Sequence, residues 1–137
     1  SGPPAQRWYL VDLAEAIAGK SCLVTVAMVL PEGSPDERVQ SAQEALRDNL
    51  RRQQVDALVK TVTARDPYQG GKDLINTYGF GPMVPNTILV GASREESRFA
   101  DYAQLIMQAG RRRRNLVIAL EGSGIQPREG PGRIDVW

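Results

Sequence analysis

The amino-acid sequence predicts an α/β fold with a mostly parallel sheet of four to five strands and helices on both faces. Apolar residues recur at helical spacing and at strand spacing in turn along the 137 residues, and the helical stretches span roughly ten residues or more. Connections of that length join parallel strands, and their helices cover the faces of the sheet. Because 42% of the residues are hydrophobic, the chain can bury a core. We therefore expect residues 1–137 to form one domain.

The chain is expected to open with a short amphipathic helix over residues 8–17. Gly19 follows it, in a position where helices commonly end. The apolar run 21–30 is predicted to be the first strand. Cys22 lies inside this run, so we expect a small core residue there rather than a nucleophile.

Residues 34–53 are predicted to form the second helix. Ser34 is expected to be its N-cap, with Pro35 at the first helical position and Glu37 three residues after the cap. The next strand is predicted over residues 55–63, where apolar and β-branched residues return.

The second half repeats this alternation. Asp66 is expected to cap a third helix that reaches Tyr78, although two glycines weaken its first turn. The predicted elements that follow are a strand at 86–91, a helix at 95–111 with Phe99, Tyr102, Leu105 and Ile106 inward, a strand at 116–120, a flexible connection at 121–132 and a last strand beginning at 133–137.

Composition narrows the function classes. Seventeen basic and sixteen acidic residues leave a net charge of +1, so no overall field attracts nucleic acid or a membrane surface. The absence of histidine removes histidine-based catalysis and most zinc or iron sites. No run approaches the roughly 20 apolar residues of a membrane span, and no nucleophile–base pair can be assembled. We predict no enzyme, no catalytic residue, no metal, no cofactor and no nucleic-acid partner.

The stretch GFGPMVPNTILVG, residues 79–91, is the most informative motif. Its glycines allow positive φ, and its prolines fix φ and remove hydrogen-bond donors, so the stretch predicts a loop that enters a buried strand. A purely structural elbow and a ligand-binding loop both fit this pattern. The residues concerned are Gly79, Gly81, Pro85, Asn86, Thr87 and Gly91.

With this elbow, the chain resembles the first half of the cytosolic C-terminal domain of the cation-chloride cotransporters, solute carrier family 12, in a prokaryotic form. Four parts match in order: AGKS before the strand LVTVAMVL, the helix QSAQEALRDNLRRQQVDAL, the GFG, PNT and ILVG elbow, and the closing GRIDVW. The resemblance implies a parent membrane protein that moves sodium or potassium with chloride, and a domain on the cytoplasmic side of the membrane. Its implied partners are a second copy and the transmembrane part of the same protein.

Family members have a strand just before the counterpart of Ser1, near the middle of the sheet. We therefore expect this chain to be a fragment with an open sheet edge or a gap that another segment fills. Exchange of an element between two copies is then a route to a homodimer.

The predicted fold also resembles universal stress proteins, which leaves a nucleotide or small-ligand sensor as the alternative function. Gly91, Ser93, Arg94 and Ser97 are the candidate nucleotide contacts, because ligands lie at the carboxyl ends of parallel strands. The loop is not glycine-rich and carries two glutamates, so Ser93 as an N-cap before an acidic first turn is the other interpretation.

One dense run of charge remains, formed by Arg111, Arg112, Arg113 and Arg114. Such a run can contact anionic lipid or a partner. It can equally complement the negative end of a helix and stay in solvent.

Overall fold

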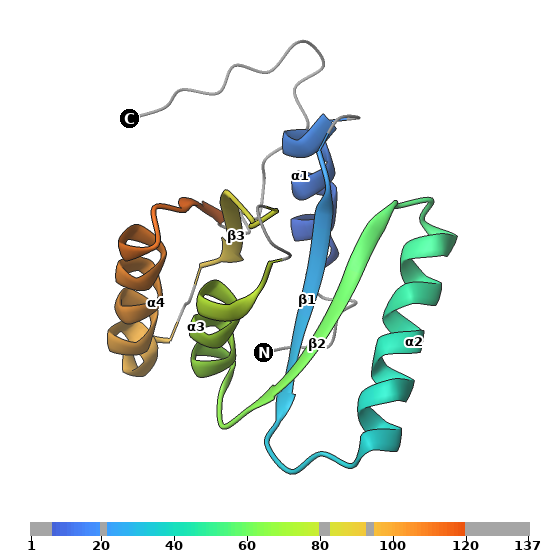
Figure 1. Cartoon of the computed structure of the whole chain (residues 1–137), viewed down its shortest axis with the longest axis horizontal. Helices are drawn as coiled ribbons and strands as arrows, with labels where there is room; N and C mark the ends of the chain where they lie inside the picture. The colour runs from blue at the N-terminus through green and yellow to red at the C-terminus, as the bar shows by residue number, and fades with distance from the viewer. Residues whose placement is uncertain (1–6, 20–21, 80–82, 93–94, 120–137) are drawn as a thin grey trace.

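The computed structural model describes residues 7–19, 22–79, 83–92 and 95–119, shown in colour in Figure 1. In chain order their elements are α1 (Trp8–Ala18), β1 (Val24–Pro31), α2 (Asp36–Arg52), β2 (Ala57–Ala64), α3 (Pro67–Thr77), β3 (Thr87–Gly91), the 3-10 helix η3 (Glu96–Arg98), α4 (Phe99–Arg111) and β4 (Asn115–Ala119). The predicted α/β alternation is confirmed over these residues. The predictions for residues 121–132 and 133–137 lie outside them.

The strands pair in parallel, as predicted, but in two separate sheets. β1 pairs with β2 from Val24–Ala57 to Pro31–Ala64, and β3 pairs with β4 from Thr87–Asn115 to Gly91–Ala119. Each pair is joined by one helix, so the described residues form two βαβ units, β1–α2–β2 and β3–α4–β4, with α3 between them in the chain.

The prediction of one sheet with four to five strands is therefore wrong for the described part of the chain. Strands in one sheet must lie about 4.8 Å apart along their hydrogen bonds, and β1 and β3 are not such neighbours. Helix α1 contacts both of these strands instead. The likeness to universal stress proteins, which depends on the single sheet, stays a prediction.

Helices cover both faces of the first sheet (Figure 1). On one face, Val11 of α1 and Leu46 and Leu50 of α2 form a buried cluster with Val55, against which the alternate β1 residues Val26 and Met28 pack. On the other face α3 lies against β1, where Gly70 meets the side chain of Val29. Successive residues of a strand point to opposite faces of the sheet. The single apolar run of β1 therefore provides core side chains to both faces.

Helix α2 ends in a Schellman motif that joins it to the core. Gln54 adopts a left-handed φ of 59°, and its N–H donates to the carbonyl of Arg51 while that of Val55 donates to Leu50. Leu50 and Val55 are 2% and 7% exposed. The helix therefore stops where its last buried leucine meets the first buried residue of the next segment.

Three local predictions are wrong. Cys22 is exposed rather than buried, because the paired part of the strand begins only at Val24. Ser34 does not cap α2: its hydroxyl donates to the carbonyl of Pro31, and the helix begins at Asp36 after an extended Pro35. Phe99 is 51% exposed, because it lies about 120° around the helix from the buried Leu105 at 100° per residue.

Candidate functional site

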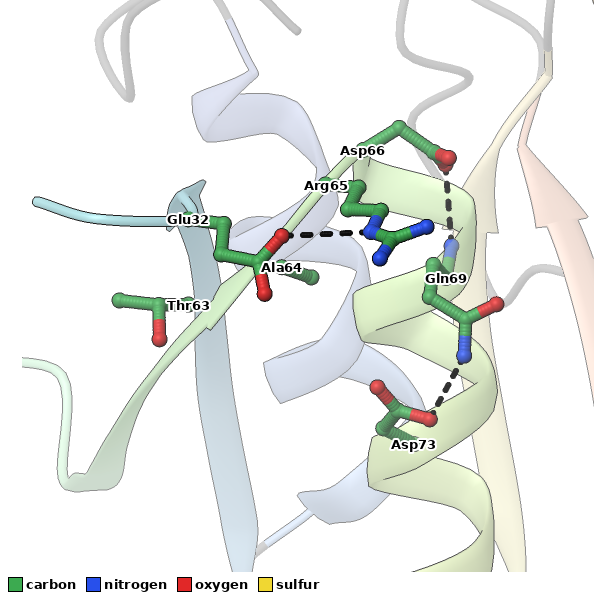
Figure 2. Close-up of a pocket in the computed structure, with 7 residues that line it drawn as sticks. All are labelled: Glu32, Thr63, Ala64, Arg65, Asp66, Gln69 and Asp73. Carbon is green, nitrogen blue, oxygen red and sulfur yellow. Dashed lines mark hydrogen bonds and ion pairs between the residues drawn. The ribbon is translucent and has the colours of Figure 1, made fainter.

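The carboxyl ends of β1 and β2 open into a polar hollow of about 530 Å³ (Figure 2). Ligands of parallel α/β sheets bind at such ends, which makes this the candidate site. Its lining residues are Glu32, Thr63, Ala64, Arg65, Asp66, Gln69 and Asp73. Among them, three carboxylates stand against one guanidinium. Arg65 Nε lies 3.3 Å from Glu32 Oε2, so that guanidinium is already paired.

Asp66 is the best-connected residue of the hollow. It caps α3 as predicted, because its Oδ1 accepts from the N–H groups of Tyr68 at 2.8 Å and Gln69 at 3.0 Å. The pKa of Asp66 is held below its ordinary value, first of all by the hydrogen bond from the N–H of Gln69. The hydrogen bond from Tyr68 and the charges of Arg98 and Lys72 lower it further, whereas partial burial acts in the opposite direction. The Asp66 carboxyl group is therefore ionised, and it caps the N-terminus of α3.

Arg98 links the hollow to the start of α4. Its guanidinium lies 3.5 Å from Asp66 Oδ1 and 3.5 Å from Asp101 Oδ2, and its carbon atom stands 4.8 Å from the centre of the Tyr68 ring. The group thus joins the start of α3, through Asp66 and Tyr68, to the start of α4, through Asp101. A cation held in this way balances the local carboxylates rather than presenting a positive surface to a ligand.

Two aromatic polar atoms are buried without a hydrogen-bond partner among the described residues: Tyr102 Oη, and Nε1 of Trp8, which packs against the core cluster. Tyr102 meets Tyr68 edge to face, with ring centres 6.2 Å apart. Burial raises the pKa of Tyr102 above its ordinary value, and the phenol groups of Tyr68 and Tyr9 add to the rise. Tyr102 is therefore a neutral phenol at physiological pH.

The described elbow residues have geometric roles. Gly79 has φ of 153°, and a Cβ atom there would come within 2.5 Å of Val84 Cγ1, so both the backbone and the packing require glycine. The carbonyl of Asn86 accepts from the N–H of Asn115 at 2.7 Å, and Thr87 begins the pairing of β3 with β4. Pro85, which directly precedes Asn86, is half-buried. Gly81 lies outside the described residues.

Of the four nucleotide candidates, the structure describes Gly91 and Ser97. A Cβ at Gly91 would come within 2.9 Å of Tyr9 Oη, so α1 already occupies the space beside the end of β3. Ser97 is exposed in η3. Ser93 and Arg94 lie outside the described residues, and so does the N-cap that was predicted at Ser93.

The arginine run follows the last turn of α4. Arg113 adopts a left-handed φ of 53°. Its N–H donates to Gly110, and that of Arg114 donates to Ala109, so the run forms a Schellman motif. Arg112 Nε donates to Asn76 Oδ1 at 3.0 Å. Arg111 and Arg113 are exposed.

Sequence reasoning missed two ion pairs, that of Arg65 with Glu32 and that of Arg98 with Asp66. For Glu32 and Arg65 the available signal was position, because each comes two positions after a predicted strand, where side chains gather at one edge of a parallel sheet. Arg98 carried no such signal for its pairing with Asp66, since that ion pair joins segments 32 positions apart in the sequence. In the described part of the chain, no three His, Cys, Asp or Glu side chains are arranged so that they could hold a metal ion.

A family match covers most of the chain. The sequence model of the family described as Solute carrier family 12 matches residues 7–124, a span that includes every described residue. A comparison with curated proteins gave no match. None of the described helices is long and apolar enough to cross a bilayer. The elbow, the order of the elements and the family match agree, and the chain belongs to solute carrier family 12, the cation-chloride cotransporters.

Proposed function

We propose that this chain is a noncatalytic regulatory and dimerisation domain of a cation-chloride cotransporter, on the cytoplasmic side of the cell membrane. Family membership supports the link to cation and chloride symport. The partners we infer are a second copy of the chain and the transmembrane part of the same protein. Transport itself would belong to that membrane part.

The observation that carries the assembly role is the pair of open sheets. In the described part of the chain, each strand has only one paired edge, and an unpaired edge offers N–H and C=O groups to another strand. Several large apolar side chains are also exposed, among them Leu58 at 44% and Ile118 at 44%, one on a strand of each sheet. An added strand, including one exchanged between copies, would use both features.

The nucleotide or small-ligand sensor has less support. Its favourable observation is the pair of unpartnered polar atoms on Tyr102 and Trp8. Against it, the hollow beside Asp66 is lined by more carboxylates than cations, and phosphate would be repelled there. Arg65, the cation that lines the hollow, is paired with Glu32, and Arg98 is engaged by Asp66 and Asp101.

The test uses the full-length cotransporter, with and without the segment that corresponds to residues 7–124. We expect the shortened protein to keep chloride-dependent cation uptake in proteoliposomes, with a changed rate and a smaller dimer fraction in detergent. An unrelated dimeric coiled coil in place of the segment should restore the dimer but not the rate. Unchanged dimer fraction and unchanged uptake in the shortened protein would overturn the proposal.

A further inference from the structure

The outer side of α4 carries an apolar stripe that nothing in the described part of the chain covers. Phe99, Ala103, Met107 and Gly110 follow one another at spacings of four, four and three residues, which places them on one side of a helix. Phe99 is 51% and Met107 53% exposed, and Ala103 and Gly110 are exposed as well. The opposite side of α4 carries Leu105 and Ala109, which are 6% and 0% exposed.

The placement of α4 leaves this stripe accessible. The helix contacts α3 and β4, and it lies at the margin of the molecule, on the far side from α2 (Figure 1). Single exposed apolar side chains are common, but Phe99 and Met107 lie in one row with Ala103 and Gly110, and an apolar patch with a polar rim is typical of an interaction site. Ala103 and Gly110 lie between and beyond them, so the surface is low enough for a second helix to approach closely, at about 8 Å between axes.

The charges at the two ends of the stripe favour a second copy of α4 as its partner. The stripe has an exposed carboxylate before its first residue, Glu96, and an exposed guanidinium after its last, Arg111. A second α4 that runs antiparallel, with the two-fold axis near Ala103, sets Phe99 of each copy beside Met107 of the other. The same axis brings Glu96 of each copy to Arg111 of the other, whereas a parallel pair would oppose like charges.

We propose that α4 is the contact between two copies of this chain, in an antiparallel pair through Phe99, Ala103 and Met107 with Glu96–Arg111 ion pairs at both ends. This inference rests on the proposed dimerisation role and adds a helix surface to the open sheet edges. An anionic membrane fits the stripe less well, because Glu96 at one end would be repelled by the lipid head groups.

The contact is expected to be weak in the isolated chain. A helix of 13 residues is about 20 Å long, and one pair of such helices buries less than the roughly 1,200 Å² of a stable interface. A dissociation constant in the micromolar range or above therefore fits. Two copies tethered to a membrane part would meet at an effective concentration of about a millimolar, which is enough to fill such a contact.

Sedimentation equilibrium of the purified chain tests the proposal. Met107→Glu should raise the dissociation constant by about tenfold or more, because it buries a charge opposite Phe99. Ile17→Glu is the matched control, since Ile17 is an apolar helix residue of α1 with a similar exposure of 42%, and it should leave the constant unchanged. Circular dichroism and the urea midpoint of both variants check that the fold is intact.

A charge series supplies an independent test that does not depend on Met107→Glu folding. Glu96→Arg alone and Arg111→Glu alone should each weaken the dimer by several fold, because each sets like charges together, and raised salt should shrink both effects. The double variant Glu96→Arg with Arg111→Glu should restore the wild-type constant, since it exchanges the two partners.

Three outcomes would overturn the α4 contact. A wild-type dimer that Met107→Glu and the single charge variants leave intact would place the interface elsewhere, with the dimerisation role still standing. A double charge variant that stays as weak as the single variants would exclude the antiparallel arrangement. A wild-type chain that is monomeric at all concentrations removes the dimerisation role itself, and if that monomer binds vesicles of anionic lipid through Arg111, the stripe belongs to a membrane.

Discussion

Gly70 offers the sharpest test of how α3 packs against the first sheet. A Cβ atom at this position would lie 2.5 Å from Val29 Cγ1 and 2.7 Å from Val29 Cγ2. Carbon atoms in contact prefer about 3.5–4.0 Å, so the methyl group of Gly70→Ala overlaps the valine by about 1 Å. Either α3 moves away from β1 or Val29 leaves its preferred rotamer.

Two opposing effects set the magnitude. Overpacking a core contact costs about 1–3 kcal/mol, whereas Gly to Ala inside a helix gains about 1 kcal/mol. We therefore expect Gly70→Ala to lower the free energy of unfolding by about 1 kcal/mol. Gly110→Ala is the control, because no described atom would lie within 4 Å of its Cβ, and it should raise the free energy of unfolding by about 0.5–1 kcal/mol.

Urea unfolding at a low protein concentration, followed by circular dichroism, measures both variants. A double-mutant cycle with Val29→Ala adds a second criterion, because shortening the valine removes the overlap and the two costs should not add. If Gly70→Ala is as stabilising as Gly110→Ala, the close approach of α3 to β1 is absent in solution and the described packing is wrong.

Changes at three further positions follow from the same structure. Gln54→Gly should raise the free energy of unfolding by about 0.5–1 kcal/mol in urea, because glycine accepts the left-handed φ that ends α2 without the strain of a side chain; a loss of stability would contradict the Schellman geometry. Asp66→Ala should cost about 1 kcal/mol through the lost cap. Asp66→Asn keeps the acceptor oxygen but not the charge. Because the folded pKa of Asp66 lies below the unfolded value of about 4, the variant should have a lower free energy of unfolding than wild type at pH 6, and this difference should vanish as the pH falls through the folded pKa. An equal difference in urea unfolding at pH 6 and below the folded pKa would refute this sign. Gly79→Ala should lower the thermal midpoint by several degrees, since positive φ and the contact with Val84 both oppose a Cβ, and an unchanged midpoint in a calorimetric scan would refute a structural role for the elbow.

The elements that sequence alone predicts well are those with signals inside the element. The spacing of the apolar residues and the glycine after Ala18 predict the bounds of α1 to within one residue. Asp66 and Pro67 predict the start of α3, because a cap and a fixed φ act on adjacent residues. Ser34 shows the limit of such signals. Its hydroxyl has a competing acceptor in the carbonyl of Pro31, and a pattern cannot choose between a cap and a local turn.

Features that depend on contacts between residues far apart in the sequence could not be predicted from it. Parallel pairing follows from long helical connections, but the pattern does not say that β1 and β3 belong to different sheets, since that depends on how α1 packs against both. The candidate site is similar. Asp66 could be predicted as a cap, whereas its pairing with Arg98 across 32 positions depends on where α4 begins.

The central claim, that this cotransporter-family chain assembles with itself and does not sense a nucleotide, is tested most directly by sedimentation equilibrium of the purified chain at rising concentration, with and without ATP. We expect a reversible monomer–dimer equilibrium whose constant does not change with ATP. A chain that stays monomeric at every concentration and binds ATP with micromolar affinity would contradict the account and favour the ligand sensor.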